Sequence, residues 1–158
     1  MKYKSILFVI IIVILLVIIG FMGLNMINNS TNSTQETVLV GSSNFTLPEG
    51  YHEGESNSYG DVNITNGEIS IFLLEYHDSD LNKHIGDYNN SINDENQTLS
   101  LTNFTYNNIM VYKAINNAHP NTVHYWYVCN NKTYSIYSWD YGNLDDIVTE
   151  LIQSQKFS

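Results

Sequence analysis

The sequence predicts an α+β domain, in which a mostly antiparallel sheet is packed with two helices, following an N-terminal transmembrane helix. Three observations support this prediction. Residues 6–24 form an unbroken apolar run of membrane-spanning length. Beyond residue 38, short segments alternate apolar and polar residues as strands do, and two longer segments repeat apolar residues at helical spacing.

The apolar run at residues 6–24 contains no charged, amide or hydroxyl side chain. Lys2 and Lys4 precede it, and positively charged flanks stay on the cytoplasmic side of a membrane. No small-x-small cleavage site follows, and the only cysteine is Cys129, so an uncleaved signal anchor is favoured over a signal peptide or a lipoprotein. The predicted parts are a cytoplasmic N-terminus (1–5), a transmembrane anchor (6–24), a flexible polar tether (25–37) and an extracytoplasmic domain (38–158).

The charge of the chain excludes one class of partner. The formal net charge is −10, and setting aside Lys2 and Lys4 leaves −10 − 2 = −12 for the outer part, which has no arginine. Nucleic acid binding is excluded because neutralising phosphates requires clustered Lys or Arg. We interpret the acidity as a source of solubility at a crowded surface.

Asparagine-containing sequons are frequent. Nine Asn-x-Ser/Thr sequons occur, where random placement gives roughly three to four. N-glycosylation outside the membrane and a simple compositional bias explain this excess equally well. The sequons within the domain are at Asn44, Asn63, Asn89, Asn96, Asn103 and Asn131.

Strands are expected over most of the domain. A first strand at 38–40 precedes a segment in which Phe45 and Leu47 point inward, and residues 48–50 form a turn. A polar loop is expected at 116–121. Three hairpins are predicted: 61–64 with 68–76 through Asn66-Gly67, 98–105 with 109–115 through Asn107-Asn108, and 122–129 with 133–139 through 130–132. If the last turn has two residues, one face holds Val123, Tyr125, Tyr127, Tyr134 and Ile136.

Two helices interrupt the strands. Residues 78–93 carry an apolar stripe of Leu81, Ile85, Tyr88 and Ile92, with N-capping side chains at Asp78, Ser79 and Asp80. Residues 143–157 form the second helix, with an apolar side of Leu144, Ile147, Val148, Leu151 and Ile152 and with Lys156 in its last turn.

This order of elements resembles a known family. The segment from Phe45 to Tyr51, the Asn-Gly hairpin and the closing Leu-Asp-Asp-Ile-Val helix are similar to uncharacterised, membrane-anchored archaeal surface proteins, and the layout resembles the Mog1/PsbP-like α/β sandwich. The resemblance implies a binding or assembly scaffold. It supplies no catalytic residue, since a fold does not determine function.

The segment from His77 to His84 holds the densest set of ligand-type side chains. Asp78, Asp80 and Asn82 copy the start of a calcium loop, but Lys83 replaces its glycine and Asn89 its glutamate. Helix capping explains the carboxylates without a metal. We therefore expect no metal site and no cofactor.

Aromatic residues gather in the last hairpin. In strict alternation, an outward row of Trp126, Tyr137 and Trp139 could stack on sugars or receive the apolar surface of a partner. The alternative is that both faces of the sheet are covered. Cys129 is expected to be a buried, inert thiol.

The leading functional hypothesis is a non-enzymatic, single-pass domain that binds a protein or carbohydrate, or acts as a scaffold, at the outer cell surface. No Gly-x-Ser-x-Gly, His-Glu-x-x-His or glycine-rich phosphate loop is present. Two alternatives stay open: a surface hydrolase or metal-dependent enzyme using the His77/His84 region, and an accessory subunit of a membrane complex.

Overall fold

The computed structural model describes residues 35–93 and 97–157. The described residues belong to one compact unit, residues 35–158. The predicted N-terminus, anchor and nearly all of the tether lie outside the described residues. Among the helices that are described, none combines the length and the apolar character needed to cross a membrane.

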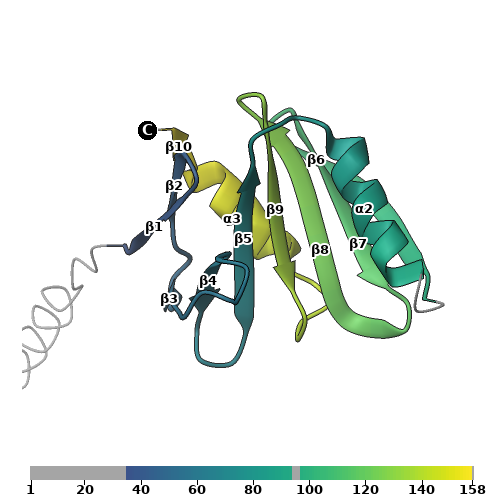
Figure 1. Cartoon of the computed structure of the whole chain (residues 1–158). Helices are drawn as coiled ribbons and strands as arrows, with labels where there is room; N and C mark the ends of the chain where they lie inside the picture. Colours follow the sequence, from purple (N-terminus) through teal and green to yellow (C-terminus); the bar gives the residue numbers. More distant parts are fainter. Residues whose placement is uncertain (1–34, 94–96, 158) are drawn as a thin grey trace, which may run out of the picture. The chain divides into compact units, whose positions relative to one another are not determined.

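The centre of the domain is a seven-stranded sheet in which all neighbours are antiparallel (Figure 1). The last predicted hairpin lies inside this sheet, and the hairpin before it forms one edge. In spatial order the strands are β3 (His52–Glu53), β4 (Val62–Thr65), β5 (Ser70–Tyr76), β9 (Lys132–Ser138), β8 (His119–Cys129), β7 (Ile109–Asn116) and β6 (Leu99–Tyr106).

A second, three-stranded sheet contains β1 (Thr37–Val40), β2 (Ser43–Thr46) and β10 (Lys156–Phe157). This corrects the predicted end of the last helix. The helix ends at Ser154, whose hydroxyl accepts from Thr46 N and donates to Thr46 O, both at 3.1 Å. Gln155 is extended, and Lys156 then pairs with Asn44 rather than lying in a last helical turn.

The two helices, α2 (Leu81–Asn93) and α3 (Asp145–Ser154), cover opposite faces of the seven-stranded sheet (Figure 1). Helix α3 and the small sheet enclose the main core, whereas α2 packs on β8 through Tyr88. The main core includes every residue predicted to share a face in the last hairpin: Val123, Tyr125, Tyr127, Tyr134 and Ile136. The predicted antiparallel sheet packed with two helices is confirmed.

Asparagine pairs form two of the two-residue hairpin turns. Asn107 and Asn108 have φ of 47° and 64°, and Asn130 and Asn131 have φ of 50° and 59°, as two-residue hairpin turns require. Tyr106 therefore pairs directly with Ile109. Asparagine tolerates this left-handed backbone better than most residues, which explains its use here.

The predicted loop at 116–121 is mostly strand. β8 begins at His119, and the register shifts between Ile115 and Asn116. Pro120 is compatible with a strand at such an irregularity, where its missing N–H breaks no regular ladder bond. The polar composition of residues 116–121 therefore led to the incorrect prediction of a loop.

Helix α2 starts later than predicted, at Leu81. Asp80 caps it, because Asp80 Oδ1 accepts a hydrogen bond from Lys83 N at 3.1 Å. Of the predicted apolar stripe only Ile92 is buried, and the other three side chains are half-buried. The second buried residue of this helix is His84.

Candidate functional site

A continuous set of aromatic rings covers the α2 face of the sheet across β5, β9 and β8. Phe72 stacks on Tyr137 with ring centroids 5.3 Å apart, and Tyr137 contacts His124 at 4.9 Å. His124 in turn stacks on Trp126 at 3.9 Å, and Tyr88 of α2 packs over Trp126 at 5.4 Å. The rings lie on neighbouring strands because their residues are directly paired partners or diagonal neighbours in the sheet.

This arrangement corrects the predicted outward row of Trp126, Tyr137 and Trp139. Helix α2 covers Trp126, which is only 1% exposed, and Tyr137 is 9% exposed. Trp139 is 50% exposed and is the member of the row that reaches solvent. The alternative, in which both faces of the sheet are covered, therefore holds at Trp126 and Tyr137 but not at Trp139.

Trp139 rests on two other rings. Its centroid lies 4.8 Å from Phe72 and 5.3 Å from Tyr137. The indole therefore has packed support and a half-exposed surface at the end of β9. We call Trp139, Phe72 and Tyr137 the Trp139 platform.

A cluster of polar side chains holds Tyr137, one member of the platform, in place. Asn57 Nδ2 donates to Tyr137 Oη at 2.9 Å and to Asp61 Oδ2 at 3.0 Å, and the Tyr137 hydroxyl donates to the same carboxylate oxygen. Burial, the hydrogen bond to Asp61 and the charge of Asp61 raise the pKa of Tyr137 well above its usual value. Tyr137 thus stays protonated and holds its ring in one orientation. No sequence signal indicated that Asn57 and Asp61 belong to this site.

His124 is neutral at physiological pH. Packing among the surrounding rings desolvates it and lowers its pKa to about 3, and Nε2 is hydrogen-bonded to Ser135 Oγ. A neutral, packed imidazole is part of the aromatic layer and supplies no charge to a ligand.

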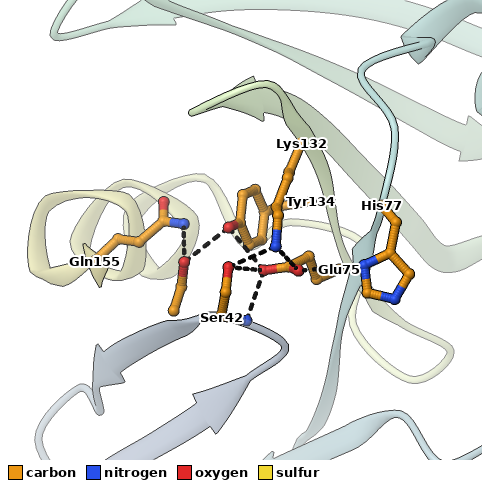
Figure 2. A network of polar contacts seen from close by, with 7 residues as sticks. Ser42, Glu75, His77, Lys132, Tyr134 and Gln155 are labelled. Carbon is orange, nitrogen blue, oxygen red and sulfur yellow. Dashed lines mark hydrogen bonds and ion pairs between the residues drawn. The ribbon is translucent and has the colours of Figure 1, made fainter. Parts of the chain in front are cut away.

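The second polar feature is a network around Glu75 (Figure 2). The Glu75 side chain is 1% exposed, and Lys132 Nζ lies 2.6 Å from its Oε1. Its Oε2 accepts from Ser42 N and Ser42 Oγ, both at 2.8 Å, and from Tyr134 Oη at 2.9 Å. Ser43 Oγ then links Tyr134 to Gln155, which joins the β1–β2 turn and the end of α3 to the sheet.

Opposing effects set the charge of Glu75. Burial alone raises its pKa, but the hydrogen bonds from Lys132, Ser42 and Tyr134 outweigh burial and lower the pKa to about 2. Gly41, at φ +60°, leaves room for the Glu75 carboxylate, because a Cβ at position 41 would collide with the Glu75 carboxyl carbon. We call this set the Glu75 network. Both carboxylate oxygens of Glu75 accept hydrogen bonds from within the domain, so the network joins its parts.

The two histidines of the predicted His77/His84 region have different environments. The His84 side chain is 7% exposed, stacks on Tyr76 at 3.7 Å and places Nε2 2.7 Å from Asp78 Oδ1. The His77 side chain is 90% exposed, with Nδ1 3.7 Å from Glu75 Oε1. Within residues 35–93 and 97–157, no three His, Cys, Asp or Glu side chains are grouped as a metal site requires.

The sequons differ in accessibility. Asn103 and Asn131 are exposed, Asn44 and Asn89 are half-buried, and Asn96 lies outside the described residues. Asn63 is 8% exposed, and its Nδ2, the atom that would carry a glycan, donates to Glu55 O at 3.1 Å. Cys129 is half-buried, and burial raises the pKa of its thiol.

The sequence matches no protein-family model and no curated protein. Among solved structures, the fold is similar to that of cyanobacterial PsbP (CyanoP) from Synechocystis sp. PCC 6803, with a TM-score of 0.49, 8% identity, and coverage of 78% of this chain and 92% of that chain. A Bacteroides thetaiotaomicron protein matches with a TM-score of 0.41 and 11% identity over 78% of this chain and 49% of that chain. At these TM-scores the Mog1/PsbP-like assignment stays a prediction.

Proposed function

We propose that this chain is a non-enzymatic, single-pass membrane protein whose extracytoplasmic domain binds a neutral carbohydrate on the Trp139 platform. The apolar run at residues 6–24, with Lys2 and Lys4 before it, supports the anchor and its orientation. The proposed location is the one predicted from the sequence. Of the three aromatic residues predicted to bind a partner, only Trp139 is exposed enough to contact a ligand.

The observation on which binding rests is the packing of Trp139. A half-exposed indole held by two rings is an ordered apolar surface, so little side-chain entropy is lost when a ligand stacks on it. Pyranose rings have an apolar C–H face that suits such a surface. Tyr137 is part of the platform, and the hydrogen bonds of its hydroxyl with Asn57 and Asp61 restrict the movement of its ring.

A small neutral ligand fits the surroundings better than a protein or an anion. The other exposed large apolar side chains come from several separate elements, including Leu39 on β1 of the small sheet and Leu101 on β6 of the large one. Scattered apolar residues do not indicate a standard protein interface, which takes 20–30 residues a side. The net charge of −10 disfavours anionic ligands.

The absence of enzymatic activity is proposed on the same grounds. Glu75 and His124 are buried titratable groups whose pKa values are strongly lowered. Both are hydrogen-bonded within the domain, Glu75 to Lys132 and His124 to Ser135. In the His77/His84 region, His84 is buried in α2 and hydrogen-bonded to Asp78, and His77 lies at the surface. Neither arrangement forms a nucleophile with an adjacent base.

Titration calorimetry tests the proposal. The full chain in detergent micelles is titrated with neutral hexasaccharides of β-1,4-glucose, β-1,4-N-acetylglucosamine and α-1,6-mannose. We expect saturable binding of at least one, and a loss of roughly tenfold or more for Trp139→Ala, since burying a large apolar side chain contributes about 1.5–3 kcal/mol. The matched control is Tyr59→Ala, which removes an 85% exposed ring outside the platform and should leave binding unchanged. Binding of no hexasaccharide, or unchanged binding by Trp139→Ala, would overturn the proposal.

A further inference from the structure

We infer that the free edge of β6 is a docking site for an extended peptide segment of another protein, which adds as an eighth strand to the sheet. β6 is the last strand of the seven-stranded sheet and pairs with β7 along its whole length, and no second strand pairs with it among the residues that the structure describes. The inference concerns a surface separate from the Trp139 platform, and it does not depend on carbohydrate binding.

The two edges of the sheet differ sharply. At one edge, β3 has two residues, His52 and Glu53, and Glu53 N donates to Glu36 Oε1 at 3.1 Å. At the other edge, β6 has eight residues and contains neither a charged residue nor proline. Soluble proteins protect sheet edges with short strands, charges or proline, so β3 is protected and β6 is not.

The register identifies the backbone groups that are available for pairing. Tyr106 and Ile109 flank a two-residue turn and form a hydrogen-bonded pair, so alternate residues from Tyr106 backward bond to β7. The N–H and C=O groups that point away from β7 therefore belong to Leu99, Leu101, Asn103 and Thr105. An added antiparallel or parallel strand would bond to these groups.

A groove beside the same edge can accept side chains of the added strand. It has a volume of about 320 Å³ and lies between α2 and β6. Its lining is partly apolar, and Leu101 is 50% exposed within it. The lining residues are Asn82, Ile85, Gly86, Asn89, Leu99 and Leu101. Main-chain bonds together with a side-chain groove are what peptide recognition by strand addition uses.

Charge and size favour a foreign peptide over a second copy of this chain. Two copies, each with a net charge of −10, repel one another, whereas a basic peptide is attracted. One strand of eight residues is also well below the 20–30 residues a side of a standard protein interface. The occupant is therefore an extended segment with apolar residues at alternate positions and basic flanks.

A fluorescein-labelled peptide that alternates valine and threonine, with a lysine at each end, is the probe. Its fluorescence anisotropy is measured against the full chain in detergent micelles. Asn103→Pro removes one outward N–H without removing a bond to β7, and we expect it to weaken binding roughly fivefold to tenfold. Asn103→Ala keeps this N–H and should bind as the unaltered chain does. Both variants remove the Asn103 sequon, so glycosylation does not separate them.

Hydrogen exchange locates the bound peptide. We expect slower exchange of the β6 amides in its presence, with the platform strands β5 and β9 unchanged. Absence of binding, equal binding by Asn103→Pro and Asn103→Ala, or protection away from β6 would each overturn the inference. Concentration-dependent dimerisation with protection of β6 and no peptide binding would assign the edge to a second copy instead, which also contradicts it.

Discussion

Replacing Lys132 by methionine is expected to lower the free energy of unfolding by about 3–5 kcal/mol, the usual cost of leaving one partner of a buried ion pair alone. Lys132 Nζ lies 2.6 Å from Glu75 Oε1, and the Glu75 side chain is 1% exposed. Without Lys132, burial raises the pKa of Glu75 with less opposition, so the carboxyl group should begin to titrate at higher pH. Urea unfolding followed by tryptophan fluorescence at pH 7 measures the loss.

The control is Lys83→Met. Lys83 forms an exposed ion pair with Asp78 at 3.9 Å, and such pairs contribute about 0–1 kcal/mol. Replacing both Glu75 and Lys132 by apolar residues should recover part of the loss, because neither charge is then left buried alone. If Lys132→Met costs no more than Lys83→Met, the Glu75 network does not join the small sheet to the large one.

Replacing Trp126 by alanine is expected to cost about 3–5 kcal/mol, the range for removing a large aromatic side chain from a core. Trp126 is 1% exposed and packs against His124 and Tyr88. Its loss leaves a cavity directly beneath α2. The same urea measurement applies, and hydrogen exchange of α2 should accelerate before that of β8.

Trp139→Ala is the matched variant on the same face of the sheet. Trp139 is 50% exposed, so its truncation should cost about 1 kcal/mol. The difference between the two losses of unfolding free energy distinguishes Trp126 from Trp139, which the sequence predicts to lie in one outward row. Equal costs for both variants would contradict the cover of Trp126 by α2 and the open position of Trp139.

Local patterns predicted most of the fold. The asparagines at 107–108 and 130–131 indicated two hairpins. The sequence left the register of the second hairpin open, and the two-residue turn at Asn130 and Asn131 fixes it. The apolar residues of α3 indicated its buried side correctly. Two errors came from tertiary context: β10 replaces the predicted last helical turn, and β8 extends through the predicted polar loop.

The candidate sites were less predictable than the fold. The platform depends on Asn57 and Asp61, which lie 80 and 76 residues from Tyr137 in sequence. The Glu75 network joins Ser42, Glu75 and Lys132 from three separate strands or turns. No pattern in a single sequence predicts such pairings, because they depend on the order of the strands in the folded sheet. In the segment from His77 to His84, the two histidines are close in sequence but have separate partners, Glu75 for His77 and Asp78 for His84.

Cysteine labelling on intact cells tests most directly whether the domain is anchored and lies outside. The full chain carries Cys129→Ser and Tyr59→Cys, which puts a single thiol at an 85% exposed position. We predict that a membrane-impermeant maleimide labels it as fully on intact cells as after permeabilisation, with the protein in the membrane fraction. The paired variant, Ser5→Cys with Cys129→Ser, should be labelled only after permeabilisation. Labelling at position 59 only in permeabilised cells, or recovery of the full chain in the soluble fraction, would contradict the account.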